Sequence, residues 1–378
     1  MPEKEQMTDA ELEKLTGKEW SELLCEHPEY ADKCPWERLT GSAWGELLRQ
    51  QPQFADRCPW EKLDGQDWCC LLGRQPQFSS RCNWKELDKA NWRDLLISQP
   101  RFADKCPWGI LSGEDWGMLL SQQPQFADKC PWEQLDGWAW CQLLQEQPKF
   151  ADRCDWDKLS EFDWYHLLHF QPQFAQKCSW EKIRRPLYWS WLLLDHPQFA
   201  DKCPWGDLDG YAWSVLLREQ PQFADKCAWE KLDGADWSSL LGEQPQFADK
   251  SCWVKLNAGD WRSLLQLQPQ FADRCPLGLW EKLDGVDWSC LMVIQPQFAN
   301  KCAWEKLDGQ EWFWLLMHQP GFADKCAWEK LDGHHWCLLL EKHPRFADKC
   351  PWKQLSEENW AEMQWTCPQF LKLRPRGE

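Results

Sequence analysis

Cysteine, whose thiol could carry out chemistry, is unusually frequent in this chain, with 21 copies among 378 residues. Regularly spaced thiols could pair as disulfides or bind a metal ion as thiolates. A metal site would need closely paired ligands such as Cys-x-x-Cys, and the sequence contains no such pair. Thirteen of the cysteines instead recur at one slot of a repeating pattern, with Ser251 in that slot once: Cys34, Cys58, Cys82, Cys106, Cys130, Cys154, Cys178, Cys203, Cys227, Cys275, Cys302, Cys326 and Cys350.

The eight histidines offer two other candidate metal sites. His166 and His169 can share a helix face, and His334 and His335 lie near Cys337. Neither group has the further ligands that would complete a defined geometry. No nucleophile with its base, glycine-rich phosphate loop or pair of catalytic carboxylates stands out either. The sequence therefore predicts a protein that is not an enzyme, with no catalytic residues, no cofactor and no metal.

These residues belong to a tandem repeat that covers nearly the whole chain, as in QPQFADRCPWEKLDGQDW (51–68) and QPQFADKCAWEKLDGADW (220–237). The period is 24 residues, except for a 25-residue step after Phe174 and a 27-residue step after Phe271. Such a period is typical of a solenoid of stacked units. One phenylalanine marks each unit, with Tyr30 in its slot at the start: Phe54, Phe78, Phe102, Phe126, Phe150, Phe174, Phe199, Phe223, Phe247, Phe271, Phe298, Phe322, Phe346 and Phe370.

Each unit also holds two framework tryptophans, one after the cysteine and one before a leucine pair, as in Trp60 and Trp68. These two slots account for 29 of the 33 tryptophans. The remaining four are therefore candidates for a role outside the framework: Trp138, Trp191, Trp314 and Trp365.

The unit that begins at Asp64 predicts three short helical segments. Asp64 is a good N-cap, and Asp67 adds negative charge at the positive end of the helix. Pro76 disfavours helical geometry at Gln75 and is suited to opening a second turn, over 76–81. A third turn follows near residues 84–86. Each piece is too short to be stable alone, so stacking against neighbouring units must stabilise it.

A helical wheel separates the two faces of the main helix. Trp68, Leu71 and Leu72 fall on one stripe, which predicts the buried face. Cys69, Cys70 and Gly73 fall on the opposite side, which we expect to be exposed. The same argument places Cys141, Cys290 and Cys337 on this exposed face.

Together these patterns predict an all-α superhelical solenoid of about fifteen 24-residue, tryptophan-rich units. We expect a capping half-repeat over 1–19, tandem repeats over 20–366 with irregular units near 180–191 and 275–280, and a C-terminal cap with a basic tail over 367–378. Neighbouring units should lie roughly 8–10 Å apart, beyond the ~7 Å that a disulfide allows between Cα atoms. The recurring cysteines should therefore be reduced and buried beside tryptophan, which is typical of the cytoplasm.

The shared pattern LLxxQPxF…W…L resembles the leucine-rich variant repeat. In that family, units of similar length alternate α- and 3₁₀-helices and stack into a superhelix. The resemblance implies the same alternation here. The tryptophan ladders and the ADKC segment depart from the family pattern, and the resemblance implies no particular function.

The formal net charge of −17 opposes general binding to nucleic acid or to anionic membranes. No apolar run is long enough to span a bilayer, and the N-terminus does not read as a secretory signal. The basic residues of the ADKC slot are usually preceded by Asp, so we expect them to be neutralised.

The variable positions of the main helix carry the remaining information about function. Exposed aromatic residues with Met are typical of recognition hot spots. We therefore predict a scaffold that binds a protein partner along an extended surface and modulates or inhibits it by occlusion. The alternatives are a single-stranded nucleic-acid or nucleotide binder that uses these aromatics and an acidic mimic of nucleic acid; some of the same side chains could instead pack between units. The candidate partner-binding residues are Tyr165, His166, His169, Phe170, Trp191, Phe313, Trp314, Met317 and His318.

Overall fold

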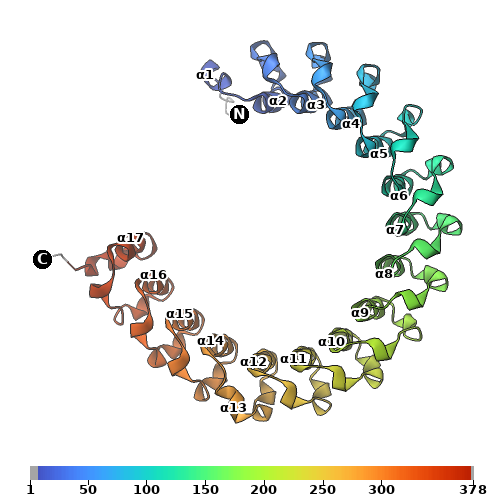
Figure 1. Cartoon of the computed structure of the whole chain (residues 1–378). Coiled ribbons are helices and arrows are strands. Elements are labelled where there is room, and N and C mark those ends of the chain that lie inside the picture. The colour runs from blue at the N-terminus through green and yellow to red at the C-terminus, as the bar shows by residue number, and fades with distance from the viewer. Residues whose placement is uncertain (1–6, 376–378) are drawn as a thin grey trace, which may run out of the picture. The chain divides into compact units, whose positions relative to one another are not determined.

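The computed structural model describes residues 7–375, so the outer ends of the predicted cap (1–6) and of the basic tail (376–378) lie outside the described residues. No strand is found in residues 7–375, and the chain is an all-α solenoid of repeated helical units (Figure 1). It divides into two compact units, residues 1–184 and 185–378.

The first unit contains a four-residue helix, α1 (Asp9–Leu12), followed by ten-residue helices that each pack against the next. These are α2 (Gly17–Glu26), α3 (Gly41–Gln50), α4 (Gly65–Arg74), α5 (Lys89–Ser98), α6 (Gly113–Gln122), α7 (Gly137–Glu146) and α8 (Glu161–Phe170). The second unit contains α9 (Pro186–Asp195), α10 (Gly210–Glu219), α11 (Gly234–Glu243), α12 (Ala258–Leu267), α13 (Leu277–Trp280), α14 (Gly285–Ile294), α15 (Gly309–His318), α16 (Gly333–Lys342) and α17 (Glu357–Thr366).

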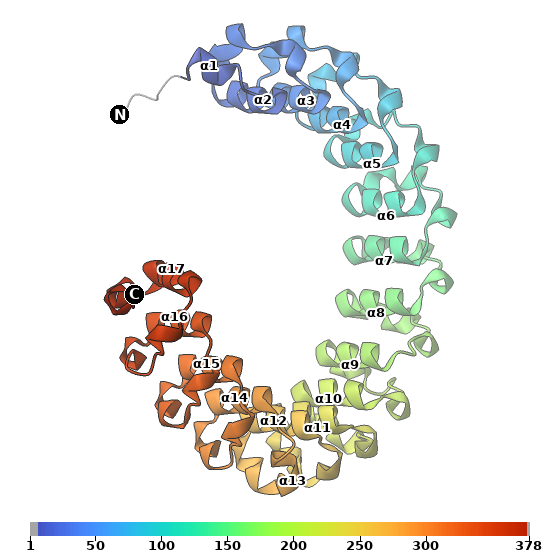
Figure 2. The ribbon, with the colours of Figure 1, turned by 60° about the vertical axis from the view of Figure 1, so that its left-hand side comes forward.

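Short 3₁₀-helices connect the α-helices and form a second layer along each unit (Figure 2). After α4 they cover Pro76–Arg81 and Trp84–Glu86, as the sequence predicts. The Asp64 carboxylate accepts a hydrogen bond from the Asp67 amide at 2.9 Å, and the Asp67 carboxylate accepts one from the Asp64 amide at 3.1 Å. This reciprocal cap begins the helix, and Gln75–Pro76 ends it.

The core of each repeat is a stack of aromatic rings over the leucine pair. Trp68, Leu71 and Leu72 are buried, which confirms the predicted stripe. Trp60 of the preceding 3₁₀-turn stacks on Trp68, with ring centroids 5.5 Å apart, and lies 5.3 Å from Phe78 of the turn that follows. The two framework tryptophans and the phenylalanine therefore form one cluster per repeat.

The residue after the helix tryptophan faces the neighbouring helix and is usually small. The prediction that Cys69, Cys141 and Cys337 are exposed is therefore wrong: all three are buried. The Cys69 thiol donates to the Asn91 carbonyl at 3.4 Å, which places it against the next helix. A wheel drawn for one helix shows the stripe that faces the 3₁₀-layer, but not the second face that packs against the neighbour. Cys70 is exposed and Cys290 is half-buried.

Two polar side chains per repeat link successive repeats by donating hydrogen bonds to backbone carbonyls. The glutamine before each proline caps the end of the preceding helix, as Gln75 does by donating to the Arg49 carbonyl at 2.8 Å. His343 occupies the same slot and places Nε2 3.3 Å from the Met317 carbonyl. The lysine that ends the second 3₁₀-turn of many repeats bridges two carbonyls, as Lys255 of the WVK turn does with those of Glu230 (2.7 Å) and Leu232 (2.6 Å). These lysines hold neighbouring turns together.

Glycine opens most of the helices because the next repeat approaches its backbone closely. A Cβ added to Gly41 would lie 2.2 Å from the Lys62 carbonyl oxygen, and one added to Gly65 would lie 2.2 Å from that of Glu86. Real Cβ atoms do not approach an oxygen so closely, so this slot controls how tightly two repeats stack.

The two repeats of irregular length have local structural causes. In the 25-residue step, Pro186 opens α9 and its N-cap Arg185 makes no side-chain cap, so the usual Asp–Gly start is missing. In the 27-residue step, the extra residues form α13 in place of a 3₁₀-turn and bury Trp280. At the ends, α1 buries Leu12, and a last 3₁₀-helix, Pro368–Leu373, follows α17.

Candidate protein-interaction surface

Four positions of each ten-residue helix face solvent at least in part in nearly every repeat. They are the residue two before the helix tryptophan and the residues two, five and six after it. We call these positions the display face. Because the framework fixes the other positions, the repeats differ mainly in the chemistry that this face presents.

The largest aromatic group in the first unit lies on α7 and α8. Trp138 of α7 stacks on Phe162 of α8 with centroids 5.7 Å apart and contacts His166 edge-on at 5.0 Å. Phe170 lies 4.9 Å from the His166 ring. We call this group, completed by Tyr165 and His169, the α7–α8 cluster. It brings together four residues that the sequence predicts, of which Phe170 is exposed and Tyr165, His166 and His169 are half-buried.

The surroundings of His166 favour its neutral form. Burial, and then the neighbouring His169, lower the pKa of His166. Its Nδ1 lies 3.3 Å from the Cys141 thiol, whose pKa burial raises to about 12. Neither group favours its charged form, so the pair does not supply a thiolate nucleophile. The cluster is suited to apolar and stacking contacts.

In the second unit, Trp191 of α9 is exposed on the display face, with its ring 5.9 Å from that of Tyr188. Tyr211 of α10 is also exposed. Both residues belong to helices that contact each other directly.

The second predicted group lies on α15 and is only partly exposed. Trp314 is 47% exposed, and its ring lies 4.3 Å from that of His318. Met317 is half-buried. Phe313 is half-buried too, because it stacks on His335 of α16 with centroids 5.1 Å apart. The wheel places Phe313 off the packed stripe; instead it occupies the slot that faces the next helix.

Sequence reasoning missed several display residues with large side chains. The sequence pattern places Trp138 outside the framework without assigning it to a site, and it does not distinguish Phe162, Tyr211, Leu267 and Val286. The signal was present, because residues two before and two and six after the helix tryptophan are four apart and share one helix face.

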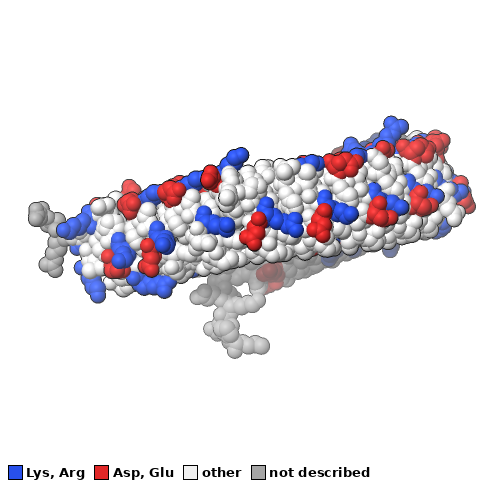
Figure 3. Space-filling model, turned by 90° about the horizontal axis from the view of Figure 1, so that it is seen from below, with Lys and Arg blue, Asp and Glu red and all other residues white. Residues whose placement is uncertain are grey.

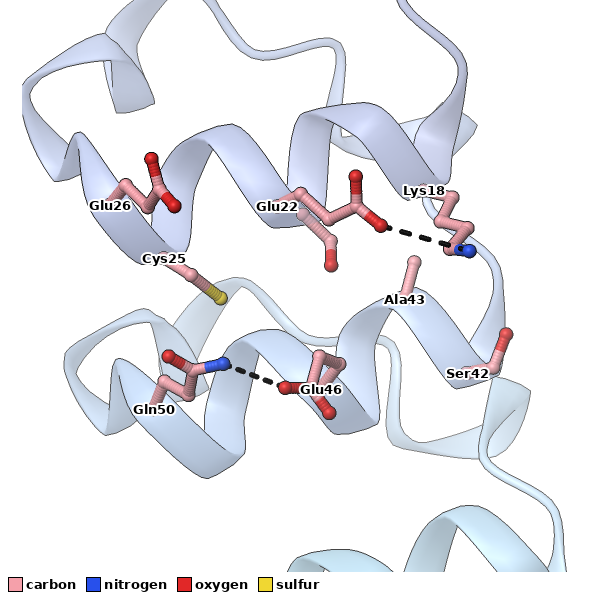
Figure 4. A pocket seen from close by; sticks show the side chains of 9 residues that line it. Lys18, Glu22, Cys25, Glu26, Ser42, Ala43, Glu46 and Gln50 are labelled. Carbon is pink, nitrogen blue, oxygen red and sulfur yellow. Dashed lines mark hydrogen bonds and ion pairs between the residues drawn. The ribbon is translucent and has the colours of Figure 1, made fainter.

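A pocket of about 450 Å³ lies between α2 and α3 (Figure 4). Cys25, Glu22 and Glu26 face it from α2, and Glu46 and Gln50 face it from α3. Burial, and then the nearby Glu46, raise the pKa of Cys25, so this thiol is not activated. Glu22 pairs with Lys18 at 3.7 Å, and Glu46 accepts a hydrogen bond from Gln50 at 2.7 Å. The pocket therefore holds carboxylates without an activated nucleophile.

The second histidine group is occupied by local contacts. His334 pairs with Glu362 at 2.9 Å, and His335 lies 3.1 Å from Asp332. Within residues 7–375, no group of three or more His, Cys, Asp or Glu side chains is placed to hold a metal ion. The described helices include none whose length and apolar character would suit it to crossing a bilayer.

Many of the basic residues of the ADKC slot are engaged locally. Lys105, Lys202, Lys226 and Lys349 each pair with the preceding aspartate, at 2.9–3.5 Å. Arg57, Arg153 and Arg274 instead lie over Trp36, Trp132 and Trp253. On the face drawn in Figure 3, basic and acidic side chains accordingly lie next to one another and do not form a patch of one sign.

The recurring cysteines are free thiols, and all 13 are buried or half-buried. Burial raises the pKa of each to about 12, or about 11 for Cys275. A higher pKa lowers the thiolate fraction at a given pH, by about a thousandfold for a shift of three units. At pH 8, iodoacetamide should modify exposed Cys70 and Cys252 rapidly and Cys58 only after unfolding. Peptide mass spectrometry of the native protein measures this order, and equal labelling of Cys58 and Cys252 would contradict it.

Comparison with protein-family models, with curated proteins and with solved structures finds no match. The regular alternation of α- and 3₁₀-helices at a spacing of about 24 residues agrees with the resemblance described above, which remains a likeness of pattern.

Proposed function

We propose that this chain is a non-enzymatic scaffold that binds a protein partner along the display face and acts by covering part of that partner's surface. The observation that carries the proposal is the concentration of large side chains on this face. Phe170, Tyr211, Leu267, Ile294 and Trp314 are all between 47% and 61% exposed, although they extend from helices whose other faces are fully packed. Exposed aromatic and aliphatic groups on a rigid framework are suited to burial against another protein.

The electrostatic features favour a protein over a nucleic acid. The lysines that end these 3₁₀-turns link neighbouring repeats, as Lys255 does, and several ADKC lysines are paired with aspartate. A nucleic-acid groove would need a continuous row of available cations. The acidic surplus is spread through the repeats, so it does not specifically favour mimicry of nucleic acid either.

The test is an affinity measurement on partners recovered with the wild-type chain, using variants of exposed side chains on and off the display face. Trp314→Ala and Phe170→Ala should each weaken a partner that contacts their region by about 2 kcal/mol, or roughly thirtyfold. Val254→Ala is the control, because Val254 is 89% exposed but lies on a 3₁₀-turn away from the display face. The proposal would be refuted if all three variants bound the partners with equal affinity, or if Val254→Ala lowered the affinity as much as the other two changes.

A further inference from the structure

The last residues of the helices in the second unit form an ordered row. In the seven ten-residue helices from α9 to α16, which leave out the short α13, they are three acids, two aliphatic residues, a histidine and a lysine: Asp195, Glu219, Glu243, Leu267, Ile294, His318 and Lys342. All seven are exposed. The last residues of α2–α8 in the first unit show no such order: Glu26, Gln50, Arg74, Ser98, Gln122, Glu146 and Phe170.

Hydrogen bonds between repeats keep this row in register. Gln220, Gln244 and Gln268 each donate to the carbonyl just before the last residue of the preceding helix, those of Leu194, Arg218 and Gly242. Gln295 and Gln319 repeat this contact at Gln266 and Val293, despite the longer step before α14. The ends of successive helices are therefore linked, and their last side chains lie side by side along the second unit.

The centre of the row is a patch of apolar side chains that are exposed to water. Leu267 is 61% exposed and Ile294 is 53% exposed, and they end α12 and α14, which contact each other. Trp314 of α15 is also exposed, and its ring lies 4.3 Å from that of His318, the next member of the row. The acidic side chains of Glu219 and Glu243 lie on one side of it, and Lys342 lies on the other. The charge along the row thus changes sign across the patch.

The spacing of the row selects the form of its ligand. Packed helices lie roughly 8–10 Å apart. A polyproline-II segment rises about 3.1 Å per residue with three residues per turn, so every third side chain points the same way at a spacing of about 9 Å. One such chain can therefore place every third residue over one helix end, whereas an α-helix rises only about 1.5 Å per residue.

We propose that this row binds an extended protein segment whose every third residue is in turn basic, basic, apolar, apolar, acidic and acidic. The basic residues lie over Glu219 and Glu243, the apolar ones over Leu267 and Ile294, and the acidic ones over His318 and Lys342. Complementary charge determines the position of the segment along the row, and the apolar pair contributes most of the affinity. This inference rests on the proposed function, because it specifies the partner of the same display face.

A synthetic peptide tests it directly. The probe is a fluorescent 16-residue peptide with Lys, Lys, Leu, Leu, Glu and Glu at every third position and Ser or Pro between them. A shuffled peptide in the order Lys, Glu, Leu, Leu, Lys, Glu has the same composition and the same apolar pair. Fluorescence anisotropy at low salt should show at least about tenfold tighter binding of the ordered peptide, because exposed charge pairs are modest individually but act together here.

The charge swap Glu219→Lys with Glu243→Lys supplies the decisive comparison. This variant should lose about tenfold in affinity for the ordered peptide and gain about tenfold for a peptide with Glu in place of both lysines. The control swap Glu26→Lys with Glu146→Lys changes the last residues of α2 and α7 and should alter neither affinity. Circular dichroism of both variants verifies that they remain folded.

Equal binding of ordered and shuffled peptides, an unchanged preference after the swap, or the absence of any peptide binding would each overturn the proposed ligand. Preferential binding to anionic vesicles or to single-stranded RNA would also overturn it. None of these outcomes contradicts the scaffold proposal, which is tested separately with Trp314→Ala and Phe170→Ala. Those two side chains can contribute to a protein interface even if the row does not bind this peptide.

Discussion

Replacing Trp312 with alanine should lower the stability of its repeat by about 3–5 kcal/mol. Trp312 is fully buried and stacks on Trp304 with ring centroids 5.5 Å apart, so its removal leaves a cavity against an aromatic surface. Its indole N–H, however, is buried without a hydrogen-bond partner, and losing that group recovers about 1–3 kcal/mol of desolvation cost. The expected effect therefore lies toward the lower end of the range.

Native-state hydrogen exchange of the α15 amides measures this effect locally, because long repeat arrays need not unfold in one step. Trp312→Phe keeps a ring in the stack and removes the unpaired N–H, so it should cost far less than the alanine change. Trp314→Ala, two residues away but 47% exposed, should change protection by no more than about 1 kcal/mol. If Trp314→Ala is as damaging as Trp312→Ala, the division into framework and display positions is incorrect.

The second large effect is expected at the close approach between repeats. Gly41→Ala should destabilise the α3–α4 interface by about 1–3 kcal/mol, although alanine favours helix formation more than glycine does. The added Cβ would lie 2.2 Å from the Lys62 carbonyl oxygen and 2.6 Å from the Asp67 carboxylate, so the two repeats must move apart. Denaturant unfolding monitored by circular dichroism measures the change.

Gly109→Ala is the matched control, because no atom lies within 4 Å of the position its Cβ would take. It should change the stability by no more than about 0.5 kcal/mol. A Gly41→Ala protein as stable as the wild type would show that the stacking distance adjusts freely, which contradicts the role assigned to this glycine.

The local parts of the fold could be predicted from sequence, because their causes lie within one repeat. The Asp64 cap, the proline stop at Pro76 and the stripe of Trp68, Leu71 and Leu72 all depend on residues a few positions apart. The burial of Cys69 and the carbonyl links of Lys255 depend on where the neighbouring repeat lies. A helical wheel contains no information about that neighbour, so these features could not be derived from it.

The same limit applies to the candidate surface. The sequence correctly groups Tyr165, His166, His169 and Phe170 near one another, because they share one helix. It misses the contact of Trp138 with Phe162, which crosses from α7 to α8. It also cannot distinguish Phe313, which stacks against the next helix, from Trp314, which faces solvent.

The glycine that opens a helix has a consequence for how such an array can gain or lose copies. Five ten-residue helices lack it, starting instead with Lys89, Glu161, Pro186, Ala258 and Glu357. Each of the five has an unusual following repeat or none. Glu161 and Ala258 precede the two irregular steps, and Glu357 opens the last described α-helix. Lys89 and Pro186 precede 3₁₀-turns whose second residue is a glycine, Gly109 and Gly206 respectively.

The first residue of a helix and the 3₁₀-turn of the next repeat therefore have to fit each other, and a duplication that keeps them together preserves that fit. Such a pair runs from Gly41 to Lys62 and the next from Gly65 to Glu86, so an exchange at the Leu63–Asp64 junction, which lies between the two pairs, splits neither of them. The glutamine and lysine links that cross this junction end on backbone carbonyls, which every sequence provides. Recombination at the leucine–aspartate junction thus keeps each helix start with the turn that packs against it, and the side-chain contacts that change are those between neighbouring helices, such as that of Trp138 with Phe162.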